Sequence, residues 1–339
     1  PLGMITTTTA SPEANPSVSI NVQVNHRIEV QKGGSVVIKD TLSLFTNPGE
    51  GMGSLQNFSI GFPFRYSSNL DYCLAYETKN PEIRLRLASN VGLGRIGFYG
   101  VRVIFDPPVD ISNGGSYKFT VVFVFSNLIS AKSESTFNLD FPMYPSLTEK
   151  SSVCNVTVAL PIEASYKASS HNFTRTTLGS YLILNHTKVL LDAFVKDFAW
   201  LSFQHSDFPL IENEEVMREI ILDEGEQSYL SDSYRIVNRG IKKLSEVSLG
   251  LPRGATQISA WDNFGSLSVS VEEKNVTTYT NVTVTLRESL NTGNRGEFTV
   301  KYFLPRETYV VQEDWRSFNL SFTMLERFHW TVRKLTVSL

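Results

Sequence analysis

The sequence predicts an all-β protein made of two tandem, mutually similar antiparallel β-sandwich-like domains with little helix. Three observations support this. Apolar and polar residues alternate along many short segments, turn residues separate those segments, and several motifs occur twice, about 180–190 residues apart. Period-two alternation between turns is typical of strands that bury one face. The length of 339 residues independently favours about two domains.

The strand-like segments carry β-branched and aromatic residues at alternate positions. They are Val18–Val24, Ser35–Leu44, Gly100–Phe105, Tyr117–Phe125, Asn155–Leu160, Tyr181–Leu184, Leu267–Val271, Thr277–Leu286 and Glu297–Phe303. Gly, Pro and Asn form turns between them at 32–34, 47–49, 113–115, 253–254 and 291–293.

Lys188–Phe203 is the one segment with a competing helical pattern. Leu190, Phe194, Phe198 and Leu201 fall near helical spacing, but the second half of the segment also alternates. We therefore expect a strand from Phe198 onward.

The internal repeat is the most informative feature. His26–Val30, Ser35–Leu44 and Leu55–Pro63 have counterparts in Arg218–Leu222, Ser228–Val237 and Leu244–Pro252. Three further motifs recur at offsets of 179, 181 and 179: Phe119–Val121 at Phe298, Phe137–Phe141 at Phe318, and Asn155–Leu160 at Lys334. We infer one β-domain used twice.

The domain limits follow from this repeat. We expect residues 1–17 to be a tag scar (Pro1–Gly3) and a disordered lead-in, 18–210 the first β-domain and 211–339 the second. The acidic run Glu212–Glu215 is interpreted as a solvated linker rather than a metal site. The sequence ends within a strand-like run, Leu335–Leu339, so we expect a further segment beyond it.

Composition and motifs argue against several functions. Lys and Arg total 31 against 34 Asp and Glu, so no cationic surface for nucleic acid is expected. The five histidines and two cysteines lack zinc-ligand spacing; His26 and His329 are expected at strand edges. Gly92–Gly97 matches a dinucleotide fingerprint, but a strand rather than a helix follows it, so we expect a turn.

No catalytic constellation emerges from the motifs. His205, Ser206 and Asp207 are contiguous, so their side chains cannot form a hydrolase relay, and a polar turn is expected. Trp261-Asp262 and Glu313-Asp314-Trp315 are the best candidates for a sugar platform, and Trp261, Tyr309 and Trp315 for exposed contacts. We predict no catalytic, cofactor-binding or metal-binding residues, and hence no enzyme.

Sequons and cysteines favour an extracytoplasmic location. The seven candidate N-glycosylation sites are Asn57, Asn155, Asn172, Asn185, Asn275, Asn281 and Asn319. Cys73 and Cys154 either pair as a disulfide in an oxidising compartment or remain buried free thiols.

The order of motifs resembles ribophorin I, the non-catalytic subunit of the eukaryotic oligosaccharyltransferase. The resemblance rests on Asn155–Pro161, Asp207–Ile211, Met217–Gly225, Gly296–Pro305, Arg316–Thr323 and Val332–Val337. It extends from about Val18 as spaced hydrophobic patterns, which suits a divergent relative such as an archaeal one.

The resemblance implies a membrane-associated glycoprotein that scaffolds a polytopic oligosaccharyltransferase catalytic subunit and guides acceptor polypeptides. It implies a location in the endoplasmic reticulum lumen or at an archaeal cell exterior, with a C-terminal transmembrane helix that this sequence does not contain. It supplies no catalytic residues and no cofactor. The alternatives are an extracellular adhesion or S-layer-like tandem β-sandwich module, and a lectin, carbohydrate-processing enzyme or β-domain like those preceding some zinc metallopeptidases.

Overall fold

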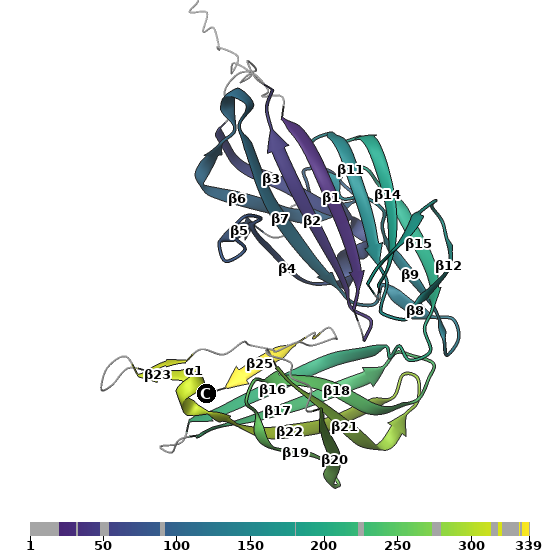
Figure 1. The fold of residues 1–339 in the computed structure, drawn as a ribbon, viewed down its shortest axis with the longest axis vertical. Helices are drawn as coiled ribbons and strands as arrows, with labels where there is room; N and C mark the ends of the chain where they lie inside the picture. The colour runs from purple at the N-terminus through teal and green to yellow at the C-terminus, as the bar shows by residue number, and fades with distance from the viewer. Residues whose placement is uncertain are drawn as a thin grey trace, which may run out of the picture.

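A computed structural model describes residues 20–31, 33–47, 54–88, 92–179, 181–222, 227–272, 279–312, 318–320, 332 and 334–338. In this part of the chain nearly all regular structure is β, as the alternation predicts (Figure 1). The helical pieces are η1 (Phe64–Asn69), η2 (Ser112–Gly114) and α1 (Arg306–Tyr309). The expected tag scar and lead-in lie outside the described residues.

We call β1–β15 the first unit and β16–β25 the second unit. The first contains β1 (Asn21–Val30), β2 (Val36–Phe45), β3 (Ser54–Pro63), β4 (Leu70–Glu77), β5 (Arg84–Ala88), β6 (Phe98–Asp110), β7 (Ser116–Phe125), β8 (Ile129–Ala131), β9 (Thr136–Pro142), β10 (Ser146–Leu147), β11 (Ser151–Ala159), β12 (Ser165–Ser169), β13 (Thr174–Leu178), β14 (Tyr181–Leu191) and β15 (Phe198–Gln204). The second contains β16 (Ile211–Leu222), β17 (Gln227–Asn238), β18 (Leu244–Pro252), β19 (Thr256–Asp262), β20 (Gly265–Glu272), β21 (Tyr279–Leu290), β22 (Arg295–Pro305), β23 (Val310–Gln312), β24 (Phe318–Leu320) and β25 (Leu335–Ser338).

The two units share one topology, which confirms their predicted similarity. The large sheet of the first has the order β10-β3-β6-β5-β4-β7-β2-β1-β11-β14-β13, and that of the second β18-β21-β20-β19-β22-β17-β16-β25. The eight strands from β3 to β11 therefore correspond one to one with those from β18 to β25. Pairing is antiparallel except at β1 with β11 and β16 with β25, which are parallel in both units.

The repeated Phe-x-Leu motif also keeps its register. In the first unit Ile129 pairs with Leu139 of β9, and in the second Val310 pairs with Leu320 of β24. In the first unit β8 and β9 belong to a four-stranded sheet of order β12-β15-β9-β8.

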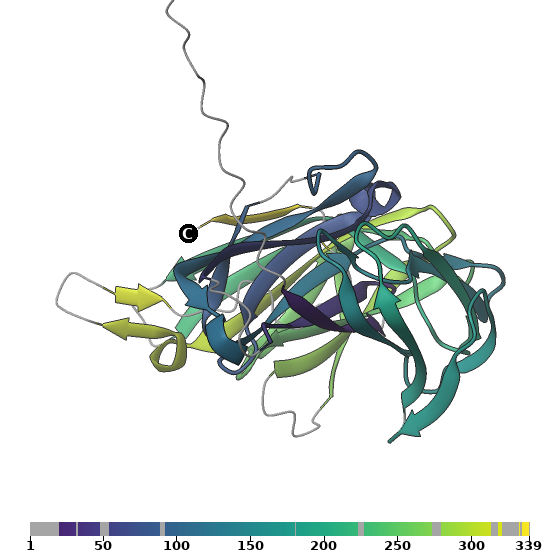
Figure 2. The same cartoon turned by 90° about the horizontal axis from the view of Figure 1, so that it is seen from above.

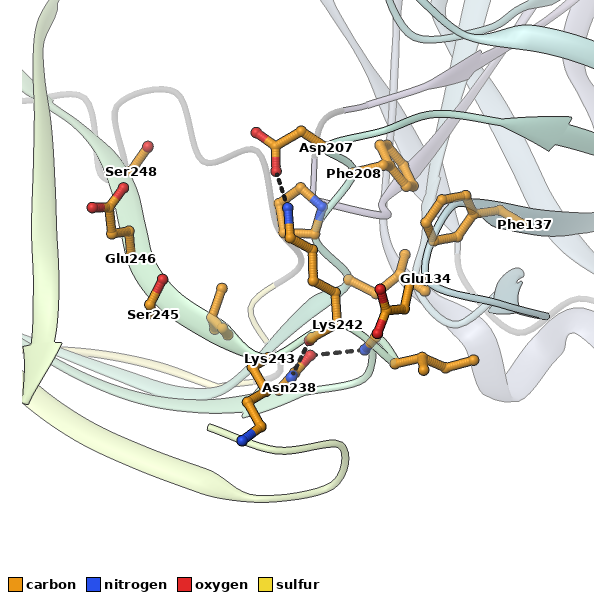
Figure 3. Close-up of a pocket in the computed structure, with 15 residues that line it drawn as sticks. Glu134, Phe137, Asp207, Phe208, Asn238, Lys242, Lys243, Ser245, Glu246 and Ser248 are labelled. Carbon is orange, nitrogen blue, oxygen red and sulfur yellow. Dashed lines mark hydrogen bonds and ion pairs between the residues drawn. The ribbon is translucent and has the colours of Figure 1, made fainter. Parts of the chain in front are cut away.

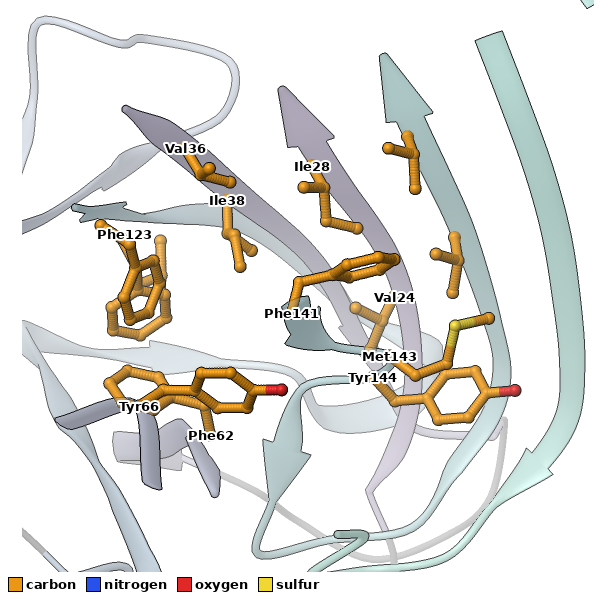
Figure 4. Close-up of a cluster of buried hydrophobic side chains, with 14 of the residues drawn as sticks. Val24, Ile28, Val36, Ile38, Phe62, Tyr66, Phe123, Phe141, Met143 and Tyr144 are labelled. Atoms are coloured by element: carbon orange, nitrogen blue, oxygen red, sulfur yellow. The ribbon is translucent and has the colours of Figure 1, made fainter. Parts of the chain in front are cut away.

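The core of the first unit lies between its two sheets. Phe141 from β9 and Phe203 from β15 pack with Val24 and Ile28 from β1 in one buried cluster, part of which Figure 4 shows. These side chains alternate along each strand, so one face of each sheet is apolar and the other polar. The units are seen one above the other in Figure 1 and from above in Figure 2.

A second buried cluster belongs to the second unit. Cluster residues of the first unit end at Leu210, and those of the second begin at Ile211. Glu212 and Asn213 are buried within β16, so the interpretation of Glu212–Glu215 as a solvated linker is wrong. Ion pairing explains the buried acid, because Arg239 Nε donates to Glu212 at 2.5 Å. The proposed domain limits themselves stay a prediction.

Each unit buries a pair formed by a basic side chain and a carboxyl group between its first two strands. Asp40 lies 2.5 Å from the Nδ1 of His26, and Asp232 bonds Arg218 at 2.6 and 2.7 Å. Both pairs are cross-strand neighbours 14 residues apart. His26 is therefore a core residue of a central strand, and its expected place at a strand edge is wrong.

The segment 188–203 contains no helix. β14 runs to Leu191 and β15 begins at Phe198, as expected for the second half. Leu190 and Phe194 both adopt a φ of 56°, which a right-handed helix does not accommodate.

Candidate functional site

The two motifs that resemble a dinucleotide-binding fingerprint and a hydrolase relay both lie in turns or loops. Gly94 and Gly97 have φ of 71° and 92° in the loop before β6, as their interpretation as a turn requires. Asp207 donates its backbone N–H to His205 Nδ1 at 3.0 Å, while His205 Nε2 contacts the carbonyl of Ile162 at 2.8 Å. The described residues contain no group of three His, Cys, Asp or Glu placed to hold a metal ion.

The cysteines are free thiols in this structure. Cys73 lies on β4 and Cys154 on β11, with β7, β2 and β1 between those strands in the sheet. Four strand spacings of ~4.8 Å each therefore separate β4 from β11. A disulfide needs its two Cα atoms within ~7 Å of each other. The disulfide alternative therefore does not fit this fold. Burial raises the pKa of both thiols.

The described sequons lie on strands or a loop with their Asn side chains at least partly accessible. Asn57, Asn155 and Asn172 are exposed, and Asn185 and Asn281 are half-buried. Thr187 Oγ1 donates to Asn155 at 3.0 Å, and Thr157 Oγ1 donates to Asn185 at 3.1 Å, so two sequons face each other across β11 and β14. Asn275 and the Asn319 side chain lie outside the described residues, as do Glu313–Trp315 and His329.

A hollow of about 230 Å³ lies where the two units meet (Figure 3). On one side, Phe137 and Phe208 pack edge to face at 5.1 Å; on the other, Lys242 forms an ion pair with Asp207 at 3.2 Å. Asn238 donates to the carbonyls of Lys242 and Leu290 and accepts from the N–H of Gly240. Its side chain therefore holds the turn at 238–243 rather than facing a ligand.

The connection between the units is tightly packed. The N–H of Ile211 donates to the carbonyl of Gly33 at 3.2 Å, and the N–H of Arg239 to the carbonyl of Leu210 at 2.8 Å. A Cβ added at Gly34 would lie 2.6 Å from Leu210 Cδ2. This hollow is best described as a structural junction.

An aromatic and charged patch lies on the smaller sheet of the first unit. Trp200 and Phe198 of β15 are exposed, and the Arg65 guanidinium lies 4.6 Å from the Phe198 ring. Asp140 bonds both Arg65 and the hydroxyl of Tyr66. Burial raises the pKa of Tyr66, and the hydrogen bond to Asp140 raises it further. Sequence reasoning missed this patch because it joins β9, β15 and η1, which are far apart in the chain.

The β19–β20 hairpin carries the predicted Trp261-Asp262 motif. A hollow of about 180 Å³ lies beside Trp261, and a larger one of about 570 Å³ lies across Asp262 and Asn263 beside the exposed Phe264. Arg287 donates to both oxygens of Asp262, at 2.9 and 3.1 Å, and lowers the pKa of that carboxyl. Asp262 is therefore held as a charged acceptor between the two hollows.

A row of charges borders the smaller hollow. Arg235 bonds Glu297 at 2.6 Å and Glu215 at 3.1 Å. Lys334 also bonds Glu215 and lowers its pKa. Tyr309, predicted as an exposed contact, is instead buried and donates its hydroxyl to the carbonyl of Arg253.

Comparison with known proteins gives only weak likenesses. No family model and no curated protein matches the sequence. An M1 zinc metallopeptidase from Deinococcus radiodurans has a TM-score of 0.32 and 12% identity over 61% of this chain and 50% of its own. An aminopeptidase N family protein from Idiomarina loihiensis has a TM-score of 0.33 and 10% identity, over 60% of this chain and 31% of its own. The chain thus spans half or less of these structures, and such scores carry no functional argument.

Proposed function

We propose that this chain is a non-catalytic accessory ectodomain of a protein N-glycosylation complex. It scaffolds a polytopic oligosaccharyltransferase catalytic subunit on the extracytoplasmic side of a membrane and guides acceptor polypeptides. No helix among the described residues is long and apolar enough to cross a membrane. Attachment through a segment outside this sequence is part of the proposal.

One observation carries the proposal. The motifs that resemble ribophorin I fall on the connection between two like β-units and on strands of both units. Asn155–Pro161 spans the end of β11, Asp207–Ile211 forms the connection, and Met217–Leu222 lies on β16. Gly296–Pro305 forms most of β22. This is the arrangement the resemblance implies for a segment passing from one β-domain to the next.

Two surface features suit a scaffold. The patch of Arg65, Phe198 and Trp200 has the residue types that dominate binding energy at protein interfaces. The strand β13 stands at the edge of the large sheet with all five side chains exposed, so its free backbone edge suits pairing with extended polypeptide.

Recovery of the full-length tagged protein from its native membranes in mild detergent tests the proposal. We expect a polytopic glycosyltransferase to co-purify, Trp200→Asp to reduce its recovery at least about tenfold, and Phe264→Asp, an exposed aromatic on the second unit, to leave it unchanged. Repeated recovery without such a subunit would refute the proposal. Recovery of only further copies of the chain or of surface proteins would favour the adhesion alternative.

A further inference from the structure

We propose that the hollow beside Trp261 is a saccharide-binding site that takes one pyranose ring of a glycan. The inference depends on the shape and chemistry of this hollow alone, and is independent of any partner subunit.

The hollow arises from one row of side chains across the outer face of the second sheet. Trp261, Thr299, Ser233 and Met217 are successive cross-strand neighbours on β19, β22, β17 and β16. Thr299 and Ser233 are small and lie between two large residues, so the surface dips between an indole wall and a thioether wall. Their hydroxyls bond each other at 2.8 Å and form a polar floor.

The polar groups around this floor have fixed positions. Glu297, Arg235 and Glu215 form the next row, two residues along each strand, and are held by ion pairs of 2.6 and 3.1 Å. Asp262 is clamped by Arg287 on the remaining side. Charged acceptors and a charged donor in fixed geometry make strong hydrogen bonds to hydroxyl groups, which can both donate and accept.

A pyranose ring matches both the apolar indole wall and the polar groups of this lining. Its C–H face packs on an aromatic ring, and its rim of hydroxyls meets the carboxylates, the guanidinium and the floor hydroxyls. Pockets for drug-sized ligands measure about 300–1,000 Å³, so a hollow of about 180 Å³ suits a single ring.

Backbone pairing with a peptide is less favourable at this place. Trp261 is already paired with Ser266 on one side and Thr299 on the other, so β19 presents no free edge there. Recognition in the hollow must come from side chains, which favours the saccharide.

The first unit contains the same row with different neighbours. Tyr76, Thr120, Thr41 and Asn25 occupy the positions of Trp261, Thr299, Ser233 and Met217. Thr41 again bonds Thr120 at 3.0 Å, but Thr78 also bonds Thr120 at 3.0 Å. Lys118, Ser43 and Gln23 replace the charged row. Tyr76 is therefore a matched control position within the same chain.

Saturation-transfer NMR and calorimetry on the whole chain, with methyl glycosides of glucose, mannose, galactose and N-acetylglucosamine, test the site. We expect at least one sugar to bind with a Kd of about 1 mM. Trp261→Ala should weaken it by at least about tenfold. Thr299→Leu, which fills the floor and keeps the indole, should do the same, and Tyr76→Ala should leave binding unchanged. Unaltered melting curves establish that the variants fold. If Trp261→Ala does not fold, the result for Thr299→Leu decides the test.

Three results would overturn the proposal: no transfer to any sugar, sugar binding that the folded Trp261 or Thr299 variant retains, or equal loss in Tyr76→Ala. An extended peptide whose binding needs Trp261 and that no sugar displaces would assign the hollow to polypeptide instead. Because purified chain and free sugar suffice, failure to co-purify a glycosyltransferase leaves this test unaffected.

Discussion

The buried Arg218–Asp232 pair makes the stability of the second unit depend on one carboxylate. Asp232 is fully buried and accepts hydrogen bonds from Arg218 at 2.6 and 2.7 Å and from Tyr302 at 2.9 Å. The pair raises the pKa of Arg218, so the guanidinium stays charged. Asp232→Ala therefore leaves a buried cation without its counter-charge.

The expected cost follows from that environment. Removing one partner of a buried ion pair costs about 3–5 kcal/mol, because the remaining charge is left without water and without a counter-ion. For a unit of this size such a loss lowers Tm by roughly 10–20 °C. Replacing both residues, as Arg218→Met with Asp232→Leu, removes the two charges together. The remaining cost is that of the buried Tyr302 hydroxyl, which loses its bonds to both residues, about 1–3 kcal/mol.

Differential scanning calorimetry with urea unfolding measures both variants, and Asp40→Ala is the matched variant in the first unit. We expect Asp232→Ala to lower the transition of the second unit and Asp40→Ala that of the first. The reasoning fails if Asp232→Ala costs less than about 1 kcal/mol. It also fails if the double substitution is as damaging as the single one.

Three further predictions concern the junction, acid stability and the thiols. Gly34→Ala should destabilise the chain by about 1–3 kcal/mol in urea unfolding, because φ is +99° and the new Cβ meets Leu210; an unchanged midpoint would contradict this. The pKa of Asp262 lies below its ordinary value of 3.8 because Arg287 bonds it, so its contribution is present above about pH 4 and is lost on further acidification. Arg287→Gln should flatten the fall of Tm below that pH, and a profile unchanged by the substitution would oppose the assignment. Without reductant, Ellman's reagent should titrate two thiols in the denatured chain. In the folded chain Cys154 should react slowly, because burial raises the pKa of its thiol. A denatured chain without free thiol would contradict the structure.

The strands could be predicted from sequence because apolar and polar residues alternate along them. The duplication could be predicted because the same motifs recur at a nearly constant offset. Ser35–Leu44 alternates over its whole length and is β2 shifted by one residue, and the recurring Phe-x-Leu motif marks β9 and β24. The buried state of Glu212 could not be predicted, because it depends on Arg239 from the following turn. The core position of His26 could not be predicted for the same reason. Its partner Asp40 lies on the neighbouring strand, and a histidine or an aspartate by itself does not indicate burial.

The hollow beside Trp261 shows which part of a site a single sequence can reveal. The indole and Asp262 stand out as a local motif, but the floor comes from Ser233 and Thr299, which are 66 residues apart and chemically ordinary. Comparing the two units gives the missing signal. Both keep a hydroxyl pair at this position, whereas the neighbouring row changes from Lys118, Ser43 and Gln23 to Glu297, Arg235 and Glu215. The hydroxyl pair is common to both units, so the changed border is the part of the hollow that distinguishes the second unit. If both proposals hold, ligand recognition belongs to the second unit, and the patch of Arg65, Phe198 and Trp200 on the first unit is left for a protein partner.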